Sequence, residues 1–425
     1  MIKKIMSVLL AAALLLSLAA CSAGDPGNGG AQGDQSQSEQ SQSGQPQAEP
    51  SQSEQPRNET PQSEPPQAEP AQEPVSEAPE WSSLSPERTM ETEYAEQFTV
   101  DYYQGGYKLI STGDGSRYLV VPQGAQVPSG LDGSVRIIKQ PLKMIYLAAT
   151  SAMALFDSLD ALDVIGLVGT KAEGWYVENA AAAINAGKMV FVGKYSEPDY
   201  EALLEYGCDL AIESTMILHT PKVQEMIEDI GIPVFIDRSS YESHPLGRTE
   251  WIKLYGAMVD KEEQAEQFFR SQAAQIEELA GQENSGKTVA FFSVSTSGKV
   301  NVRSSTDYVP KMIELAGGKY IFEDLTEEDS ARSSLTITME DFYATAVNAD
   351  YLIYNSAIDN PLNSMDDLMS KSQLFADFKA VKEGNVWCTG KQLYQATDIV
   401  GNFITDIHRM LTGDTEGMTF IYKIN

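Results

Sequence analysis

Residues 144–159 read MIYLAATSAMALFDSL, and this stretch sets the architecture of the chain. Residues 144–148 are a compact apolar run, which is typical of a buried strand. Thr150 and Ser151 then supply residues that favour the start of a helix, and apolar side chains recur at helical spacing as far as Leu159. The stretch predicts a strand that leads directly into a helix, the repeating unit of α/β folds.

The same unit recurs further along the chain. Compact apolar runs that fit strands buried on both faces occur at residues 164–168, 189–192, 210–212 and 234–236. Helical or loop segments separate them. One such segment has its N-cap, its first helical residue and its end marked by Thr220, Pro221 and Gly231. This alternation predicts a mainly parallel α/β lobe, which we place at residues 143–259.

Two helices follow this lobe, since apolar residues recur at helical spacing over 251–258 and again over the longer segment 265–279. A second set of strands and helices lies between residues 289 and 388. We therefore predict two Rossmann-like α/β lobes joined by a long rigid helix at 260–282, the second lobe occupying 283–425. A ligand cleft is expected between the lobes, because such junctions are common binding sites.

The start of the chain is a targeting segment. Two lysines precede the almost wholly apolar residues 5–20, a run too short for a stable bilayer span, so residues 1–20 read as a signal peptide. The sequence Leu18-Ala19-Ala20-Cys21 resembles the lipobox of bacterial lipoproteins, in which the cysteine thiol receives a lipid and becomes the new N-terminus. An ordinary secretory cleavage, with Cys21 as a bystander, is the alternative. Both place the protein outside the cytoplasm.

Residues 21–93 are expected to form a lipidated, disordered stalk, because up to about residue 80 they are Gln, Ser, Glu, Pro and Gly with hardly an apolar side chain. A flexible coil of roughly 60 to 70 residues spans about 45 Å. Residues 94–142 are expected to form a β-hairpin extension, since apolar segments flank the turn Gly113-Asp114-Gly115.

Acidic residues outnumber basic ones by 61 to 30, which gives a formal charge of −31. So negative a chain repels nucleic acid, and we expect no nucleic-acid partner. Apart from Cys21, only Cys208 and Cys388 remain, far apart in sequence and in apolar surroundings, so both are predicted to be buried free thiols.

Several ordered motifs resemble one protein family. The segments DSLDALDVIGLVG, GKYSEPDYEALLEYGCDLAI, IEDIGIPVFI and KLYGAMVDKEEQAEQFF in the first half are similar to the N-terminal lobe and connecting helix of substrate-binding proteins for iron-siderophore, haem and cobalamin importers. IELAGGKYIF, LTITMEDFYATAVNADYLIY and FKAVKEGNVWCTG resemble the family's later motifs. Two features depart from it: Cys208 stands where the family usually has proline, and residues 241–251 are more elaborate.

The resemblance implies a monomeric binding protein of an ABC importer that captures a metal chelate such as a ferric siderophore, haem or a corrinoid. It implies no chemistry, no cofactor and no metal held directly by the protein. It also places Glu201 and Glu340 at corresponding positions in the two lobes, where such glutamates dock on permease arginines. The alternative for this pair is that acidic residues simply favour the first turn of a helix.

Sequence patterns typical of nucleotide-binding, zinc-binding and hydrolytic proteins do not fit this chain. Residues 281–288 match the phosphate-binding P-loop pattern, but a helix precedes them and a strand follows, the reverse of a P-loop. The three histidines have no zinc-site spacing, and no nucleophile elbow occurs. A secreted lipid-anchored hydrolase and a surface adhesin remain the alternative functions.

Ligands of parallel α/β lobes meet the loops at the carboxyl ends of the strands. Aromatic side chains there can lie against a flat chelate, and arginines can pair with its acidic groups. The alternatives are that Trp175 and Tyr176 close the lobe edge, that Arg238 or Arg248 balances surface acids, and that the histidines are satisfied by backbone. The predicted ligand-binding residues are Thr150, Ser151, Trp175, Tyr176, Tyr195, Ser214, Thr215, His219, Arg238, Ser239, Tyr241, His244, Arg248, Arg303, Tyr308 and Tyr394.

Overall fold

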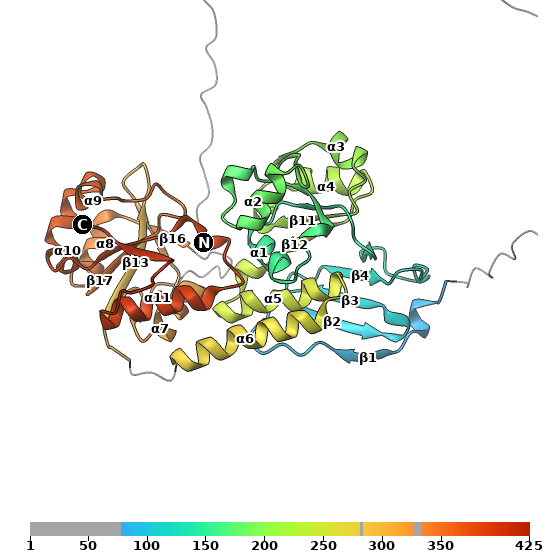
Figure 1. The fold of residues 1–425 in the computed structure, drawn as a ribbon, viewed down its shortest axis with the longest axis horizontal. Helices are drawn as coiled ribbons and strands as arrows, with labels where there is room; N and C mark the ends of the chain where they lie inside the picture. Colours follow the sequence, from blue (N-terminus) through green and yellow to red (C-terminus); the bar gives the residue numbers. More distant parts are fainter. Residues whose placement is uncertain (1–77, 281–283, 327–333) are drawn as a thin grey trace, which may run out of the picture. The chain divides into compact units, whose positions relative to one another are not determined.

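The computed structural model describes residues 78–280, 284–326 and 334–425. The predicted signal peptide, Cys21 and most of the predicted stalk lie outside the described residues. The described residues form an extension sheet, an N-terminal lobe, two successive helices and a C-terminal lobe, in this order along the chain (Figure 1). None of the described helices is both long and apolar enough to cross a membrane.

The extension is larger than the predicted hairpin. It is a five-stranded sheet in the order β1-β2-β3-β4-β5, antiparallel except for the parallel pair β4 and β5. The hairpin of β3 and β4 around residues 113–115 is confirmed. The elements are η1 (Trp81–Ser83), β1 (Pro86–Thr89), β2 (Phe98–Tyr103), η2 (Gln104–Gly106), β3 (Lys108–Thr112), β4 (Arg117–Val121) and β5 (Arg136–Lys139).

Residues 78–93 were assigned to the stalk, and this was wrong for η1 and β1. Trp81 packs on Tyr103 with ring centroids 4.5 Å apart, and β1 pairs with β2. Arg88 lies over the Tyr102 ring at 3.4 Å. These contacts depend on residues that follow later in the chain, so the polar composition of the segment did not indicate them.

The two faces of the extension sheet have different partners. Alternate side chains such as Ile110 and Tyr118 join the core shared with the lobes, and Tyr118 packs against Phe235 of the N-terminal lobe at 4.8 Å. The opposite side chains, including Leu109 and Leu119, form a smaller core with residues of the loop between β4 and β5. Because successive side chains of a strand point to opposite faces of the sheet, both faces of the extension sheet are buried.

A short segment, residues 93–97, ties the extension to the helix that follows the N-terminal lobe, and we call it the strap. The fully buried carboxylate of Glu250 accepts the backbone N–H groups of Glu93, Tyr94 and Ala95 at 2.8 to 3.1 Å. The buried carboxylate of Glu242 accepts those of Glu96 and Gln97 at 2.8 and 3.0 Å.

The strap explains why residues 241–251 are more elaborate than the family motif. Besides Glu242 and Glu250, this segment contains Gly247, where a Cβ atom would stand 2.8 Å from the carbonyl oxygen of Tyr94. Only glycine leaves room for the strap at this point. The indole N–H of Trp251 donates to Glu242 at 2.9 Å and completes the contact.

The N-terminal lobe has the predicted parallel sheet, in the order β12-β11-β6-β7-β8. All five strands coincide with predicted apolar runs. From β6 the chain adds β7 and β8 on one side of the sheet, and then β11 and β12 on the other side. Ligands are expected at the carboxyl ends of β6 and β11, where this strand order reverses. The elements are β6 (Ile145–Leu147), α1 (Thr150–Ser158), η3 (Leu162–Val164), β7 (Ile165–Val168), η4 (Ala172–Gly174), α2 (Glu178–Asn185), β8 (Val190–Phe191), β9 (Gly193–Lys194), β10 (Glu197–Pro198), α3 (Tyr200–Glu205), β11 (Leu210–Ser214), η5 (Thr215–His219), α4 (Pro221–Asp229), β12 (Val234–Asp237) and η6 (Ser239–Tyr241).

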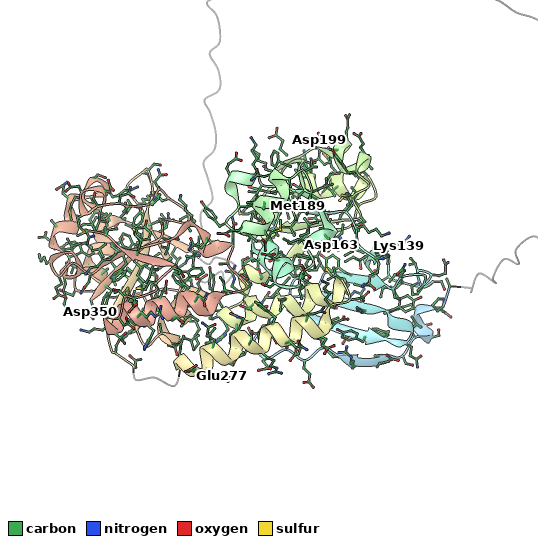
Figure 2. The ribbon with its side chains drawn as sticks, in the orientation of Figure 1. Lys139, Asp163, Met189, Asp199, Glu277 and Asp350 are labelled. Carbon is green, nitrogen blue, oxygen red and sulfur yellow. The ribbon has the colours of Figure 1, made fainter. Side chains whose placement is uncertain are left out.

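Local signals for the helix ends were partly right. Pro221 opens α4 and Gly231 follows its end with a positive φ of 87°, as predicted. Thr220 is the N-cap residue, but its hydroxyl donates to the carbonyl of Ile217 and makes no capping bond to the helix. Asp199 does cap α3, accepting the N–H of Ala202 at 3.0 Å, and it projects from the margin of the lobe (Figure 2).

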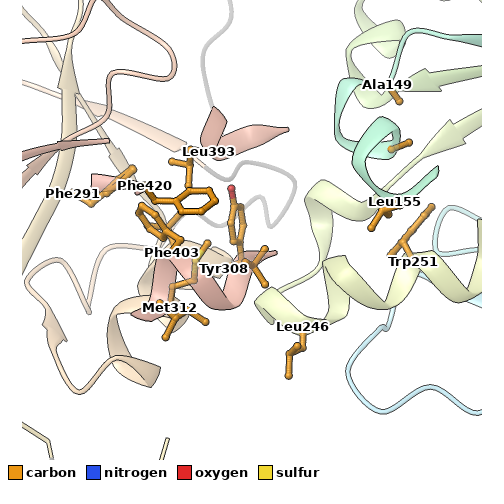
Figure 3. Close-up of a cluster of buried hydrophobic side chains, with 14 of the residues drawn as sticks. Ala149, Leu155, Leu246, Trp251, Phe291, Tyr308, Met312, Leu393, Phe403 and Phe420 are labelled. Atoms are coloured by element: carbon orange, nitrogen blue, oxygen red, sulfur yellow. The ribbon is translucent and has the colours of Figure 1, made fainter. Parts of the chain in front are cut away.

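Two packed helices connect the lobes: α5 (Pro245–Met258) and α6 (Glu262–Ala280). The predicted connector at 260–282 is α6, and residues 281–283 lie outside the described part of the chain. Gly256 lets the helices approach, since a Cβ atom there would be 2.8 Å from that of Ala265. Every residue of α5 is buried, and Figure 3 shows Leu246 and Trp251 of this helix in the hydrophobic core.

The C-terminal lobe is α/β as predicted, but its sheet is mixed. Besides the parallel pairings among β15, β13, β17 and β18, the sheet contains β14, which is antiparallel to both β13 and β16, and β19, which is antiparallel to β18; β14, β16 and β19 were not predicted from the sequence. Since α6 ends before the P-loop-like residues and β13 follows them, the inverted context is confirmed. The elements are β13 (Thr288–Val294), β14 (Val300–Arg303), α7 (Tyr308–Leu315), β15 (Lys319–Tyr320), β16 (Ser334–Ile337), α8 (Met339–Ala346), β17 (Tyr351–Tyr354), α9 (Met365–Lys371), η7 (Gln373–Asp377), α10 (Lys379–Lys382), β18 (Val386–Thr389), η8 (Lys391–Tyr394), α11 (Val400–Thr412) and β19 (Ile421–Lys423).

Candidate ligand-binding site

Two residues at the carboxyl ends of strands in the C-terminal lobe contact the hydroxyl of Tyr394. Arg303 ends β14 and its Nη2 donates to the Tyr394 hydroxyl, while Asn355, which follows β17, donates to the same hydroxyl through Nδ2 at 2.6 Å. The guanidinium carbon of Arg303 lies 5.2 Å from the centre of the Tyr394 ring. Two of the predicted residues, Arg303 and Tyr394, are therefore in contact.

A second arginine reaches this cluster from α5. The guanidinium carbon of Arg248 stands 4.1 Å from the centre of the Tyr308 ring, and both side chains are buried. Tyr308 opens α7 beside the hydrophobic core, where Figure 3 shows it near Phe403 and Phe420. Burial raises the pKa of Tyr308 to about 12, with Arg248 acting in the opposite direction, so its hydroxyl is neutral.

We call Arg248, Arg303, Tyr308, Asn355 and Tyr394 the arginine cluster. The carboxylate of Asp307 lies 3.6 Å from Nη1 of Arg303. The same Nη1 donates to Ser334 Oγ at 3.1 Å. The cluster thus contains two buried guanidinium groups, of which that of Arg303 pairs with Asp307. Among the described residues, Arg248 Nε, the Tyr308 hydroxyl and Asn355 Oδ1 are buried without a hydrogen-bond partner. Buried polar atoms of this kind favour a polar or anionic partner.

Sequence reasoning missed Asn355 and Asp307. Asn355 directly follows the strand at 351–354, so the rule used for the other loops would have found it. Asp307 precedes Tyr308 as the N-cap of α7, accepting the N–H of Val309 at 3.0 Å, and an N-cap motif gives no sign of an arginine partner.

The predicted residues of the N-terminal lobe are mostly engaged by their own surroundings. Ser239 is buried and donates through its N–H and hydroxyl to Asp237, at 2.9 and 2.6 Å. Ser214 Oγ accepts the N–H of Met216 at 3.4 Å, and Thr215 Oγ1 lies 3.5 Å from Ser240 Oγ. Half-buried Thr150, Ser151, Tyr195 and Tyr241 and exposed His219 lie on this lobe as well.

Two arginines of the predicted set have different surroundings. Arg248 belongs to the arginine cluster, whereas Arg238 pairs with Asp114 of the extension at 3.5 Å and lies 4.7 Å from the centre of the Tyr241 ring. Arg238 follows β12 at the carboxyl edge of the sheet. Arg238 therefore has a carboxylate partner from the extension, whereas Arg248 packs against an aromatic ring.

His244 acts as the N-cap of α5. Its Nδ1 accepts the N–H of Leu246 at 3.1 Å, and its ring stacks on Tyr94 of the strap with centroids 4.5 Å apart. Burial, followed by the charge of Lys311, lowers the pKa of His244 to about 4. It is a neutral structural residue at pH 7, and it also lines a cavity of about 680 Å³ with residues of α7.

The loop after η8 bridges the two lobes. The side-chain amide of Gln395 accepts the N–H of Tyr176 at 2.7 Å and donates to the carbonyl of Gly174 at 2.8 Å. Asp398 accepts the hydroxyl of Ser158 at 2.9 Å. Trp175, between the two bridged residues, is buried and donates its indole N–H to the carbonyl of Thr170, while Tyr176 is 44% exposed.

Cys208 and Cys388 are free and buried, as predicted. Burial raises the pKa of Cys208 to about 12 and that of Cys388 to about 11, so both remain thiols at neutral pH. Within the described ranges, no group of three or more His, Cys, Asp or Glu side chains is placed to hold a metal ion.

Comparison with known proteins places the chain in a family. The model of the periplasmic binding protein family matches residues 152–393, from α1 to η8. Two uncharacterized lipoproteins of Methanocaldococcus jannaschii are each 26% identical to the chain, over 68% and 78% of its length and 70% and 86% of theirs.

Solved structures agree at the level of the fold. A possible iron-binding (periplasmic solute-binding) protein of Staphylococcus epidermidis has a TM-score of 0.51 and 17% identity, covering 64% of this chain and 98% of its own. A periplasmic haem-binding protein of Vibrio cholerae has a TM-score of 0.50 and 18% identity, covering 64% and 97%. With more than half of its residues matched by the family model, the chain belongs to the periplasmic binding protein family.

Proposed function

We propose that this protein is the substrate-binding lipoprotein of an ABC importer, that it captures an anionic metal chelate, and that it delivers the chelate to the permease. Family membership supports solute binding outside the cytoplasm and argues against an enzyme. The arginine cluster is the observation that carries the ligand class, because it contains two buried guanidinium groups, and Nε of Arg248 is buried without a hydrogen-bond partner among the described residues. Buried arginines of this kind recognise carboxylates and related acidic groups.

Ferric siderophores, haem and corrinoids are the ligands to test. The Vibrio cholerae neighbour is a haem-binding protein and the Staphylococcus epidermidis neighbour a possible iron-binding one, and these names support that choice. The rings of Tyr308 and Tyr394 lie against the two arginines, and aromatic rings beside guanidinium groups suit a flat or aromatic chelate.

The decisive experiment changes Arg248 to Met and measures chelate affinity by fluorescence quenching. Met keeps the apolar bulk but removes the guanidinium, so the affinity for an anionic chelate should fall at least about tenfold, equivalent to about 1.4 kcal/mol. Arg117→Met is the matched control, because Arg117 is 40% exposed in its side chain and pairs with Asp132 in the extension. Equal affinities of the two variants would contradict the ligand class.

The anchor is the second part of the proposal. Only a thiol accepts the lipid, so changing Cys21 to Ala should release the protein from the membrane or leave its precursor unprocessed. Detergent-phase partitioning and the mass of the processed chain measure this. Unchanged partitioning of the variant would contradict the anchor, and ordinary secretory cleavage would then account for the leader.

Docking on the permease is the third part. Glu201 and Glu340 are exposed in the first turns of α3 and α8, the positions that the family resemblance predicts. Replacing both with Ala should abolish uptake while ligand affinity and melting temperature stay nearly unchanged, because exposed acids contribute little to stability. Glu178→Ala with Asp341→Ala is the matched control. Normal transport by the Glu201 and Glu340 double variant would contradict the docking role.

A further inference from the structure

The extension sheet reaches the carboxyl edge of the N-terminal lobe. Its strand β4 lies beside β12, as the contact of Tyr118 with Phe235 shows (Figure 1). The turn before β4 carries Asp114, whose Oδ2 stands 3.5 Å from Nη1 of Arg238, the residue that follows β12. The extension lies outside the segment matched by the family model, so that model does not describe this carboxylate.

The turn holds Asp114 in a defined position. Oδ1 of Asp114 accepts the hydroxyl of Thr112 at 2.7 Å and the N–H of Ser116 at 3.2 Å, which leaves Oδ2 for Arg238. Gly115 has a φ of 81°, which a non-glycine residue adopts only with strain. The carboxylate is therefore preorganised by its own hairpin.

The strap fixes the turn relative to Arg238. The N–H of Gly113 donates to the carbonyl of Gln97 at 2.8 Å, and the N–H of Gln97 donates to Glu242 at 3.0 Å. Glu242 lies in the same loop as Arg238, just beyond η6. Hydrogen bonds thus connect the loop to the strap, the strap to the turn, and the turn back to the loop.

Arg238 is confined by this arrangement. Tyr241 lies against one face of its guanidinium, and Nε is buried without a partner among the described residues. The nearby carboxylate of Asp237 is occupied by Ser239 and by the Tyr255 hydroxyl. Burial acts to raise the pKa of Asp114, but Thr112, Ser116 and Arg238 outweigh it and lower that pKa, so Asp114 is ionised at neutral pH.

We propose that Asp114 is a specificity-determining residue, and that the extension acts through it to neutralise the N-terminal half of the ligand site. This inference rests on the proposed function. In the C-terminal half, the buried guanidinium of Arg248 has no ion pair with a carboxylate among the described residues and lies over the Tyr308 ring instead. A ligand with acidic groups at one end and a neutral opposite end fits this asymmetry, while a chelate that is anionic all round is disfavoured near Asp114.

The test compares Asp114→Asn with the wild-type protein. Asn keeps an oxygen for Thr112 and Ser116 but removes the charge that faces Arg238. Affinities are measured by fluorescence quenching for haem, for a neutral ferric trihydroxamate and for a trianionic ferric triscatecholate. We expect the ratio of triscatecholate to trihydroxamate affinity to rise about three- to fivefold, the size typical of a partly exposed ion pair.

Asp132→Asn is the matched control, since Asp132 lies in the same extension and pairs with Arg117 instead. It should leave the ratio unchanged. The Arg238→Gln background provides a second control, because Asp114→Asn should have no further effect on the ratio there. An equal effect of both aspartate variants, or an effect that persists without Arg238, would overturn the specificity role.

A ligand-independent measurement separates this inference from the proposed function. Labelling of Arg238 with phenylglyoxal, followed by mass spectrometry, should become faster in Asp114→Asn and not in Asp132→Asn. If Arg238 labelling became faster in Asp114→Asn but the wild-type protein bound none of the chelates, the metal-chelate function would be wrong and the pairing of Asp114 with Arg238 would be supported. If chelates bound and labelling stayed unchanged, the pairing itself would be wrong.

Discussion

Strands β11 and β17 occupy equivalent places in the two lobes, and an aspartate precedes each of them. Asp209 accepts the N–H groups of Lys143 and Met144 just before β6, and Asp350 accepts the N–H of Thr288 at the start of β13. Each aspartate therefore joins two neighbouring strands of its sheet. Asp350, labelled in Figure 2, also binds the Thr288 hydroxyl and Lys379.

The two carboxylates consequently differ in acidity. Burial raises the pKa of Asp209, whose Oδ1 has no partner among the described residues, in spite of its backbone hydrogen bonds. Burial acts in the same direction on Asp350, but Lys379 and Thr288 outweigh it and lower the pKa. Two aspartates with the same backbone hydrogen bonding thus have pKa values shifted in opposite directions.

The difference extends along the strands. Glu213 near the end of β11 is fully buried with neither carboxylate oxygen partnered in the described structure, and burial raises its pKa to about 9. The equivalent residue of β17 is Tyr354, whose hydroxyl donates to Asp359 and accepts the N–H of Val294. Glu213 is therefore protonated in the folded N-terminal lobe at neutral pH, and the stability of this lobe should depend on pH.

The largest effect is expected from Glu213→Gln. The native pKa of Glu213 lies above the unfolded value of 4.5, so the folded protein retains its proton and stability falls as the pH rises from about 4.5 towards 9. At pH 7 this penalty is about 3 kcal/mol. Gln cannot ionise, so the variant should be more stable than the wild type at pH 7 and nearly equal at pH 4. Urea unfolding at both pH values measures this, and parallel pH profiles would contradict a neutral Glu213.

Substitution of the paired aspartates sharpens the comparison. Asp350→Asn removes the charge that Lys379 and Thr288 stabilise, so unfolding at pH 7 should become easier by about 1–2 kcal/mol. Asp209→Asn should have a smaller effect, because Asn still accepts backbone N–H groups and avoids burying a charge. Since the pKa of Asp350 is lowered, its contribution is present above the unfolded value of 3.8 and is lost as the pH falls below it. Equal losses at pH 7 would contradict the asymmetry.

The smallest effect at pH 7 concerns His244, which lies between the strap and α7. Its native pKa of about 4 is below the unfolded value of 6.5, so the unfolded chain binds the proton more readily and stability falls as the pH drops from 6.5 towards 4. Lys311 and Glu314 are the charges that act on it. His244→Asn keeps an N-capping acceptor without titrating, so its melting temperature should change less over this range. A wild-type decline that the variant reproduces in full would exclude His244 as its source.

Much of the fold was predictable because parallel strands are buried on both faces. The runs at 164–168, 210–212, 234–236 and 351–354 all coincide with strands, since a doubly buried strand needs continuous apolar residues. The antiparallel pair β14 and β16 escaped notice: VNVR and SLTI alternate apolar with polar residues and are only four residues long, so their patterns resemble loops.

The site was predictable only in part. The rule that ligands meet the carboxyl ends of strands selected Arg303, Tyr308 and Tyr394, and the structure brings these together with Arg248. Whether any of them contacts ligand stays a prediction. The pairing of Arg238 with Asp114 joins residues more than a hundred positions apart through a sheet that the sequence analysis took for a hairpin. Such contacts depend on tertiary packing, which local patterns do not encode.

The strap has a practical consequence for the boundaries of the folding unit. A fragment cut to the family-matched residues would lack the backbone N–H groups of residues 93–97, although Glu242 and Glu250 would remain within it. Glu242 would keep its hydrogen bond from Trp251 and Glu250 its ion pair with Lys253, but both buried carboxylates would lose their backbone donors, and the apolar surface that the extension covers would be exposed, which favours aggregation. Homology alone would therefore select an insoluble fragment, and a recombinant version should begin before Trp81 so that the extension folds with the lobe it completes.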